Sequence, residues 1–204
     1  MKIKTFVCGY INNNVYIIYD ESKECAIVDA PFNCAELLTR FIRQNNLTPI
    51  YILLTHGHFD HTGGLAELKK QTNAKIVIHK NDAYRLEKTE EMGIKLEPVD
   101  ADILLKGNEI LQLGKTKINV LFTPGHTEGG VSYVLAKEKV VFVGDTLFYG
   151  SIGRTDFAGG DFNTLITSIK ENLLVLPDDF CVYPGHGETT TIKYEKLYNP
   201  YINM

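Results

Sequence analysis

The sequence predicts an α/β fold in which short strands alternate with helices. Runs of β-branched and aromatic residues, bounded by turn residues, recur along the whole chain, and such runs are typical of strands. Between several of them, apolar residues repeat at helical spacing. Four of the strand-like runs lead into a histidine or an aspartate. Because strand-end loops commonly carry the site of a layered α/β fold, this pattern supports the same fold class.

Eight segments are expected to form strands: residues 15–19, 26–28, 50–54, 75–78, 118–122, 131–136, 140–143 and 180–183. Three are expected to form helices: residues 34–44, 64–71 and 162–174. The first of these has apolar residues at helical spacing, namely Leu37, Leu38, Phe41 and Ile42. Asp161 is placed to cap the third. Residues 84–108 are the most charged and least periodic part of the chain, so we expect a helix followed by a surface excursion there.

Length and composition favour one globular domain covering residues 1–204. Of the 204 residues, 44% are hydrophobic and 23% are charged, and single cores extend to about 200–250 residues. The net charge of −4 is spread along the chain, so no nucleic acid and no membrane is expected as a partner. The sequence has no recognisable signal peptide or spanning segment, which predicts a cytoplasmic protein. The four cysteines form no CxxC pair and are expected to be reduced.

The most informative pattern is a set of metal-type ligands that follow four of the strands. Four of them lie in the stretch THGHFDH, and two more are the histidines that end the similar turns TPGH and YPGH. A rigid sheet can bring ligands so far apart in sequence to one place. The set comprises five imidazoles and two carboxylates: His56, His58, Asp60, His61, His126, Asp145 and His186.

Seven ligands are too many for one metal ion and suit two. A zinc ion takes about four ligands, and a catalytic zinc keeps one position open. Two ions about 3.5–4 Å apart need a bridging group, and a carboxylate can reach both. Asp145, which is alone at its strand end, is the candidate bridge. His79 also ends a strand but lacks the glycine turn, so it is either an eighth ligand or a structural residue before the next helix.

The motifs THGHFDHTGG, TPGHT, GDTLF and PGHGETT, in this order, resemble the metallo-β-lactamase superfamily. Within it, the chain is most similar to the hydroxyacylglutathione hydrolases, known as glyoxalase II, and their short bacterial relatives. The resemblance covers nearly the whole chain and implies a four-layer αβ/βα sandwich. Histidine at position 58 departs from the HxExDH pattern of the diiron flavoproteins, and Asp145 departs from lactamases that carry a cysteine there.

The same resemblance implies how two metal ions divide the ligands. One ion would be held by His56, His58 and His126, the other by Asp60, His61 and His186, with Asp145 bridging. Zinc is the first expectation, with iron or manganese as alternatives. Two such ions lower the pKa of a bridging water, which yields a hydroxide that can attack a thioester carbonyl.

Asp60 and Asp145 are the expected catalytic carboxylates, since Asp60 can orient the hydroxide or accept its proton while also ligating. Asp29 ends a strand and is either an acceptor that fixes a ligating imidazole or a turn residue. Tyr149, Arg154 and Asn14 are candidate substrate contacts. For Arg154, the alternative is an ion pair with Asp156 that holds the loop together.

The substrate expected from the resemblance is a small thiol conjugate such as an acyl-glutathione. Full-length glyoxalase II enzymes have a C-terminal helical domain that contacts glutathione, whereas 18 residues follow His186 here, so no such separate domain is expected. The segment GRTDFAGGD is also similar to persulfide dioxygenases, which use one iron; in that alternative His58 and His61 do not bind metal. A catalytically silent module that binds thiol conjugates is the third possibility.

Overall fold

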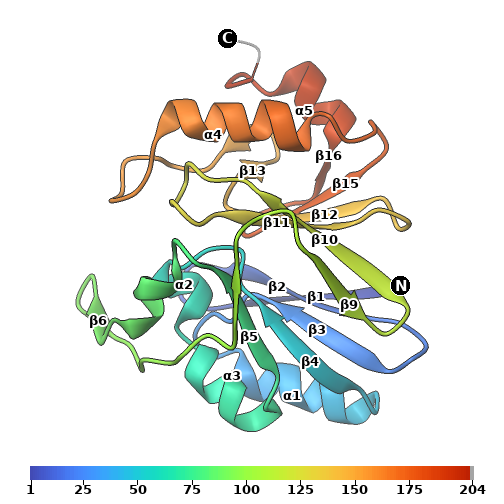
Figure 1. Cartoon of the computed structure of the whole chain (residues 1–204), viewed down its shortest axis with the longest axis vertical. Coiled ribbons are helices and arrows are strands. Elements are labelled where there is room, and N and C mark those ends of the chain that lie inside the picture. Colours follow the sequence, from blue (N-terminus) through green and yellow to red (C-terminus); the bar gives the residue numbers. More distant parts are fainter. Residues whose placement is uncertain (203–204) are drawn as a thin grey trace.

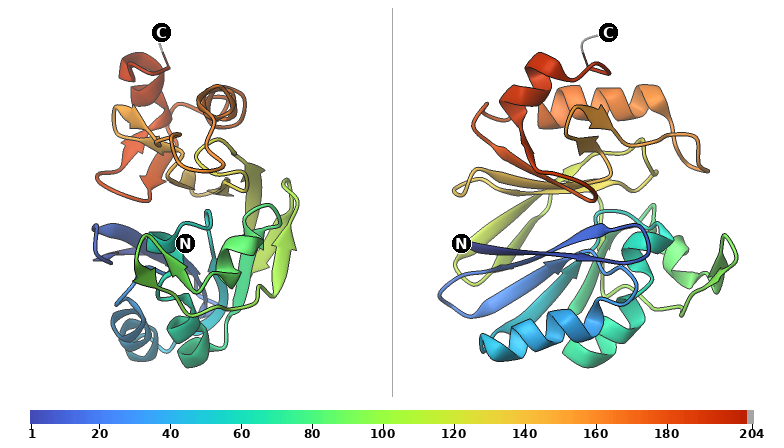
Figure 2. Two further views of the ribbon diagram at one scale, coloured as in Figure 1. Left: turned by 90° about the vertical axis from the view of Figure 1, so that its left-hand side faces the viewer. Right: turned by 180° about the vertical axis from the view of Figure 1, so that it is seen from behind.

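The computed structural model describes residues 1–202, and the last two residues of the expected domain lie outside the described residues. The chain forms two six-stranded sheets that pack face to face, with helices on both outer sides (Figure 1). The four layers are seen edge-on in Figure 2. The αβ/βα sandwich expected for the chain is therefore confirmed.

The first sheet is mixed and has the order β1-β2-β3-β4-β5-β8. Its strands are β1 (Lys2–Cys8), β2 (Asn13–Tyr19), β3 (Glu24–Val28), β4 (Thr48–Leu53), β5 (Lys75–His79) and β8 (Ile103–Leu105). The first three are antiparallel, whereas β3, β4, β5 and β8 run parallel. Helices α1 (Ala35–Gln44) and α3 (Leu65–Thr72) cover its outer face.

The second sheet has the order β16-β15-β12-β11-β10-β9. Its strands are β9 (Ile110–Leu113), β10 (Thr116–Phe122), β11 (Val131–Leu135), β12 (Val140–Gly144), β15 (Cys181–Pro184) and β16 (Thr190–Thr191). A short hairpin, β13 (Leu147–Phe148) and β14 (Ser151–Ile152), follows β12. Helix α4 (Phe162–Ser168), its π-helical continuation Ile169–Leu173 and α5 (Ile192–Tyr198) cover the outer face.

Three apolar cores follow from the side-chain alternation of strands that are buried on both faces. In β2, Ile17 packs toward α1, whereas Tyr16 and Ile18 face the other sheet. In β12, Phe142 packs between the sheets and Val141 packs toward α4. The middle core fixes the two sheets relative to each other, and it therefore fixes the loops at their common edge.

All eight expected strands and all three expected helices are present, with ends that differ by one or two residues. Asp161 caps α4 by accepting a hydrogen bond from the backbone of Thr164, as expected. All four cysteines are free, as expected. Within residues 1–202, no helix has the length and apolar character that a membrane span requires.

The expectation for residues 84–108 is partly wrong. The helix is a single 3₁₀ turn, Ala83–Glu87, followed by a small hairpin of β6 (Glu90–Glu91) and β7 (Ile94–Lys95). The chain then returns as β8, which extends the first sheet beside β5. The expected surface excursion is thus present, but it ends in a short strand. The few residues of this strand are stabilised by pairing with β5, and their sequence alone has no pattern that predicts a strand.

The packing of α1 against the first sheet can be tested by replacing two adjacent leucines of this helix. Leu38 is fully buried, whereas Leu37 is 41% exposed. We expect Leu38→Ala to lower the free energy of unfolding by about 2–5 kcal/mol, because it removes packed side-chain atoms and leaves a cavity. Leu37→Ala is the matched control and should change stability by less than about 0.5 kcal/mol. Urea denaturation measures both, and equal losses in the two variants would contradict this packing.

Candidate metal centre

The connection from β4 to α3 carries four of the seven expected ligands. His56 and His58 lie in the extended segment that leaves the end of β4, and the short helix α2 (Phe59–Thr62) carries Asp60 and His61. His58 has extended backbone angles and directly precedes the helical turn. The change from extended to helical backbone separates the two halves of the motif in space.

The other three ligands come from the second sheet. His126 follows β10, Asp145 follows β12 and His186 follows β15. Gly185 precedes His186, and a Cβ at this position would lie 2.3 Å from Oδ1 of Asp145. Glycine is therefore required where this turn passes the site.

The structure brings all seven of these side chains together at the edge where the two sheets meet. They form three groups that can hold a metal ion, and within each group the donor atoms lie within 4.8 Å of one another. Two of the groups are separate triads; the third joins Asp145 to one histidine of each triad. The members are His56, His58 and His126 for the first triad, and Asp60, His61 and His186 for the second, with His56, His61 and Asp145 in the third group.

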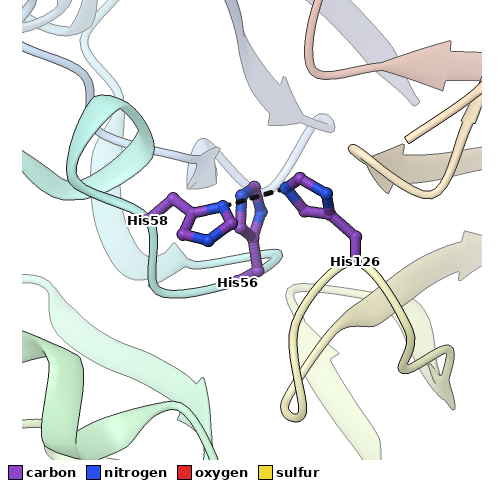
Figure 3. Close-up of side chains that lie close together, drawn as sticks. All are labelled: His56, His58 and His126. Carbon is purple, nitrogen blue, oxygen red and sulfur yellow. Dashed lines mark hydrogen bonds between the residues drawn. The ribbon is translucent and has the colours of Figure 1, made fainter. Parts of the chain in front are cut away.

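The first triad is drawn in Figure 3, where His56 and His58 from one loop face His126 from the other sheet. Nδ1 of His58 lies 2.9 Å from Nε2 of His126. Burial lowers the pKa of His58 to about 3, and the neighbouring His126 and Arg85 add to this effect. Burial also lowers the pKa of His56 and His126. Neutral imidazoles are the form that binds a metal ion.

Asp145 lies between the two triads. Its Oδ1 is 3.3 Å from Nε2 of His61, and its Oδ2 is 3.7 Å from Nε2 of both His126 and His186. Burial opposes the charged imidazole of His61, but the carboxylates of Asp60 and Asp145 outweigh it and raise the pKa of this histidine. The second triad is thus richer in negative charge than the first.

Several buried polar atoms at the centre make no hydrogen bond with any residue in 1–202. Three of them belong to expected ligands: Nε2 of His56, Nε2 of His61 and Oδ1 of Asp145. An unsatisfied buried donor or acceptor costs about 1–3 kcal/mol, and metal coordination would satisfy all three. The residues present therefore fit a pair of cations, and their donor set is the one typical of a dinuclear site in this fold.

Asp29 orients an imidazole of the second triad directly and one of the first triad through a threonine. Its Oδ2 accepts a hydrogen bond from Nδ1 of His61 at 2.8 Å. Its carboxylate also accepts from the Thr55 hydroxyl, and this oxygen lies 3.1 Å from Nδ1 of His56. Both rings thereby present Nε2 to the centre. Of the two roles expected for Asp29, the acceptor role is confirmed.

The backbone of Arg154 orients a histidine of the first triad, and its side chain stabilises the loop in which it lies. Its carbonyl accepts a hydrogen bond from Nδ1 of His126 at 2.7 Å. Its side chain makes two hydrogen bonds of 2.7 Å with Asp156 and lies over the ring of Phe157. The guanidinium is thus engaged in the structural pair that was the alternative to substrate binding.

The other two candidate substrate contacts also have structural partners. Both N–H groups of the Asn14 amide donate to backbone oxygens, those of Pro184 and Gly187. Asn14 therefore positions the loop before and after His186 and has no free donor for a substrate. Tyr149 is 50% exposed and stacks on Tyr194. This stacking joins the turn between β13 and β14 to α5.

His79 stands apart from the centre. It is buried, its ring stacks on Phe122 with centroids 4.4 Å apart, and its Nδ1 accepts a hydrogen bond from the backbone of Asn81. Of the two roles expected for His79, the structural one fits its position.

Two residues at the centre were not expected from the sequence. Nδ2 of Asn13 donates to Oδ2 of Asp60 at 2.9 Å and lies 3.3 Å from Nε2 of His186. Three consecutive asparagines, residues 12–14, stand where β2 begins, and the expected contact was the neighbouring Asn14. Since side chains alternate along a strand, register decides which asparagine faces the site, and the sequence does not fix that register.

Asp82 is the second unexpected residue, and it joins the loops of both sheets. Its buried carboxylate accepts hydrogen bonds from the backbone of Gly57, between His56 and His58, and from Thr127 and Gly129, just after His126. The three distances are 2.7, 2.8 and 2.8 Å. One side chain therefore sets the separation of the two arms of the first triad.

Comparison with known proteins agrees with this geometry. The profile of the metallo-β-lactamase superfamily matches residues 9–186. The probable metallo-hydrolase YqgX of Bacillus subtilis is 38% identical, with 100% of this chain and 98% of the relative covered. The hydroxyacylglutathione hydrolase GloC of Haemophilus influenzae is also 38% identical, with 100% and 99% covered.

Solved structures show the same fold. The BLEG-1 B3 metallo-β-lactamase has a TM-score of 0.94 and 37% identity, and each chain is covered completely. TTHA1623, solved in a di-iron-bound form, has a TM-score of 0.86 and 32% identity, with 97% of this chain and 99% of that chain covered. The chain belongs to the metallo-β-lactamase superfamily. With its histidine-rich centre, it is a metal-dependent hydrolase of that superfamily.

The role of Asp29 can be tested with the isosteric amide. In Asp29→Asn, the Thr55 backbone N–H still needs the oxygen, so the amide N–H₂ faces Nδ1 of His61 and forces the other tautomer. We expect metal affinity to fall by about 10–100-fold, as is typical for such partners. Titration with a chromophoric chelator measures this, with the surface variant Asp178→Asn as control. Unchanged affinity in Asp29→Asn would argue against the orienting role.

Removing the connection between the two loops tests Asp82. Asp82→Asn places a donor against the N–H and O–H groups that now donate to the carboxylate, and we expect a loss of about 2 kcal/mol in the free energy of unfolding. Thr127→Val removes one of the three hydrogen bonds and should cost less. Urea denaturation of the metal-free proteins measures the free energy of unfolding of both variants. A larger loss of this free energy in Thr127→Val than in Asp82→Asn would refute the role of Asp82 in joining the two loops.

Proposed function

We propose that the protein hydrolyses thioesters of small thiols, in the manner of a hydroxyacylglutathione hydrolase, with two zinc ions. The observation that carries this proposal is the complete set of seven donors, arranged as two triads with Asp145 between them. The full-length similarity to GloC supports the thioester as the bond that is cleaved. A one-iron dioxygenase would leave His58 and His61, one residue of each triad, without a metal to bind.

The residues would divide between the ions as the triads do. His56, His58 and His126 would hold the first ion, Asp60, His61 and His186 the second, and Asp145 would contact both. Two divalent ions, when bound, act as Lewis acids and lower the pKa of water so that it can attack a carbonyl carbon near neutral pH. The carbon–sulfur bond then breaks, and the products are a carboxylic acid and a thiol.

The chain's own groups supply orientation for this reaction. Asn13 fixes Oδ2 of Asp60, so the carboxylate of Asp60 is held in one direction and can orient the attacking water and accept its proton. Asp29 and Thr55 fix the imidazoles of His61 and His56 in the tautomer that presents Nε2. No serine or cysteine nucleophile is needed.

Replacing the central carboxylate is the most direct mutational test. We expect Asp145→Ala to lower kcat/KM for S-lactoylglutathione by more than about 100-fold, since even residues outside the ligand set cost 10–100-fold. It should also reduce the bound metal. Asp179→Ala removes a surface ion pair with Lys139 and is the matched control. Full activity in Asp145→Ala would rule out a central role for this carboxylate.

A substrate panel distinguishes thioester hydrolysis from other activities of the same ligand set. The zinc-loaded protein should hydrolyse S-lactoylglutathione faster than a lactone or a β-lactam at equal concentration. The iron-loaded protein should consume no oxygen when glutathione persulfide is added. Oxygen uptake with a single bound iron would replace the proposal by the dioxygenase.

A further inference from the structure

A cavity of about 400 Å³ adjoins the metal centre on the side of the β6–β7 hairpin. Its floor is formed by His58 and Asp60, one residue from each triad. A group that occupies the cavity therefore lies directly beside any substrate carbonyl at the centre. This volume is within the range of pockets that hold small molecules or large parts of them.

The walls of this cavity are apolar. They are formed mainly by Phe59, Tyr84, Met92 and Phe157. The ring of Phe157 is fixed from two sides, since it lies 5.8 Å from the ring of His58 and 3.7 Å from the Arg154 guanidinium. An aromatic wall held in this way favours an apolar occupant.

The charged residues of the cavity leave no free cation for an anionic group. Arg85 is buried and pairs with Glu128 at 2.8 Å. Lys88 pairs with Glu91 at 2.6 Å. The remaining charged group, Asp60, is itself a carboxylate. An anionic group, such as a carboxylate of glutathione, would therefore find no unpaired cationic side chain in this cavity.

The hairpin presents an apolar side chain at a position that turn chemistry does not favour. Met92 and Gly93 form the two-residue loop between β6 and β7, and both have positive φ angles, of 50° and 78°. Asparagine followed by glycine is the preferred pair in such a turn. Methionine is uncommon at this angle, and here it is 71% exposed at the edge of the cavity.

We infer that this cavity, lined by Phe59, Tyr84, Met92 and Phe157, receives the acyl group of the substrate, and that this group is an apolar aliphatic or aromatic chain larger than lactoyl. The inference deepens the proposed thioester hydrolysis and rests on it. The thiol carrier, which bears the carboxylates, lies outside this cavity.

The kinetic test is a series of acetyl-, butanoyl- and hexanoyl-glutathione with the zinc-loaded protein. We expect kcat/KM to rise with chain length, by up to about fourfold for each methylene that becomes fully buried. Met92→Asn keeps or improves the turn, so it should reduce this rise without unfolding the hairpin. Val175→Asn, at a residue 69% exposed elsewhere, should leave the rise unchanged. A flat series in the wild type, or the same rise in Met92→Asn, would overturn the inference.

A binding measurement separates this inference from the proposed activity. The chain has 3 methionines, so methyl-labelled protein gives a simple spectrum in which Met92 is assigned by its loss in Met92→Asn. S-hexylglutathione should shift the Met92 signal, whereas S-methylglutathione should not. Met1 lines a different cavity beside Asp20 and Lys137, and its signal is the internal control. A shift without thioester hydrolysis would refute the proposed function alone; hydrolysis of S-lactoylglutathione without the shift would refute the acyl cavity alone.

Discussion

Two sheets that pack face to face bring the ends of their strands to a common edge, and the centre depends on this constraint. Five imidazoles and two carboxylates meet there, and Nε2 of His61 lies within 3.4 Å of two carboxylate groups. Buried polar atoms without partners are costly, so the middle core must hold the loops in place against this cost. The folded state is stable because the favourable free energy of apolar packing offsets the cost of the polar atoms without partners. Metal binding would lower the free energy of the folded state further.

Hydrogen bonds between the sheets make the edge specific. Asp82 joins the loop of His56 and His58 to the loop of His126. The Tyr133 hydroxyl, on the second sheet, donates to the carbonyl of Leu54 at 2.7 Å. Tyr16, on the first sheet, donates to the carbonyl of Pro184 just before His186. The two tyrosine bonds each link a core strand of one sheet to the backbone that leads into a ligand loop of the other sheet, so packing and ligand geometry are set together.

The sequence predicted what is encoded locally and missed what depends on pairing or register. The centre was found because its ligands stand in short motifs at strand ends, and Asp29 was found because it ends a buried strand. Asp82 gives no such signal, since its partners lie 25 and more positions away. Strand β8 was missed because three residues have no readable period, and they form a strand only by pairing with β5. Asn13 and Asn14 could not be told apart because the register of β2 is set by its neighbours.

Anomalous X-ray scattering from crystals of the zinc-loaded protein would show most directly whether the centre holds two metal ions. A dinuclear centre would give two peaks about 3.5–4 Å apart. One should lie among His56, His58 and His126 and the other among Asp60, His61 and His186, with the carboxylate of Asp145 between them. A single peak in zinc-saturated crystals, or peaks remote from these side chains, would contradict the dinuclear centre.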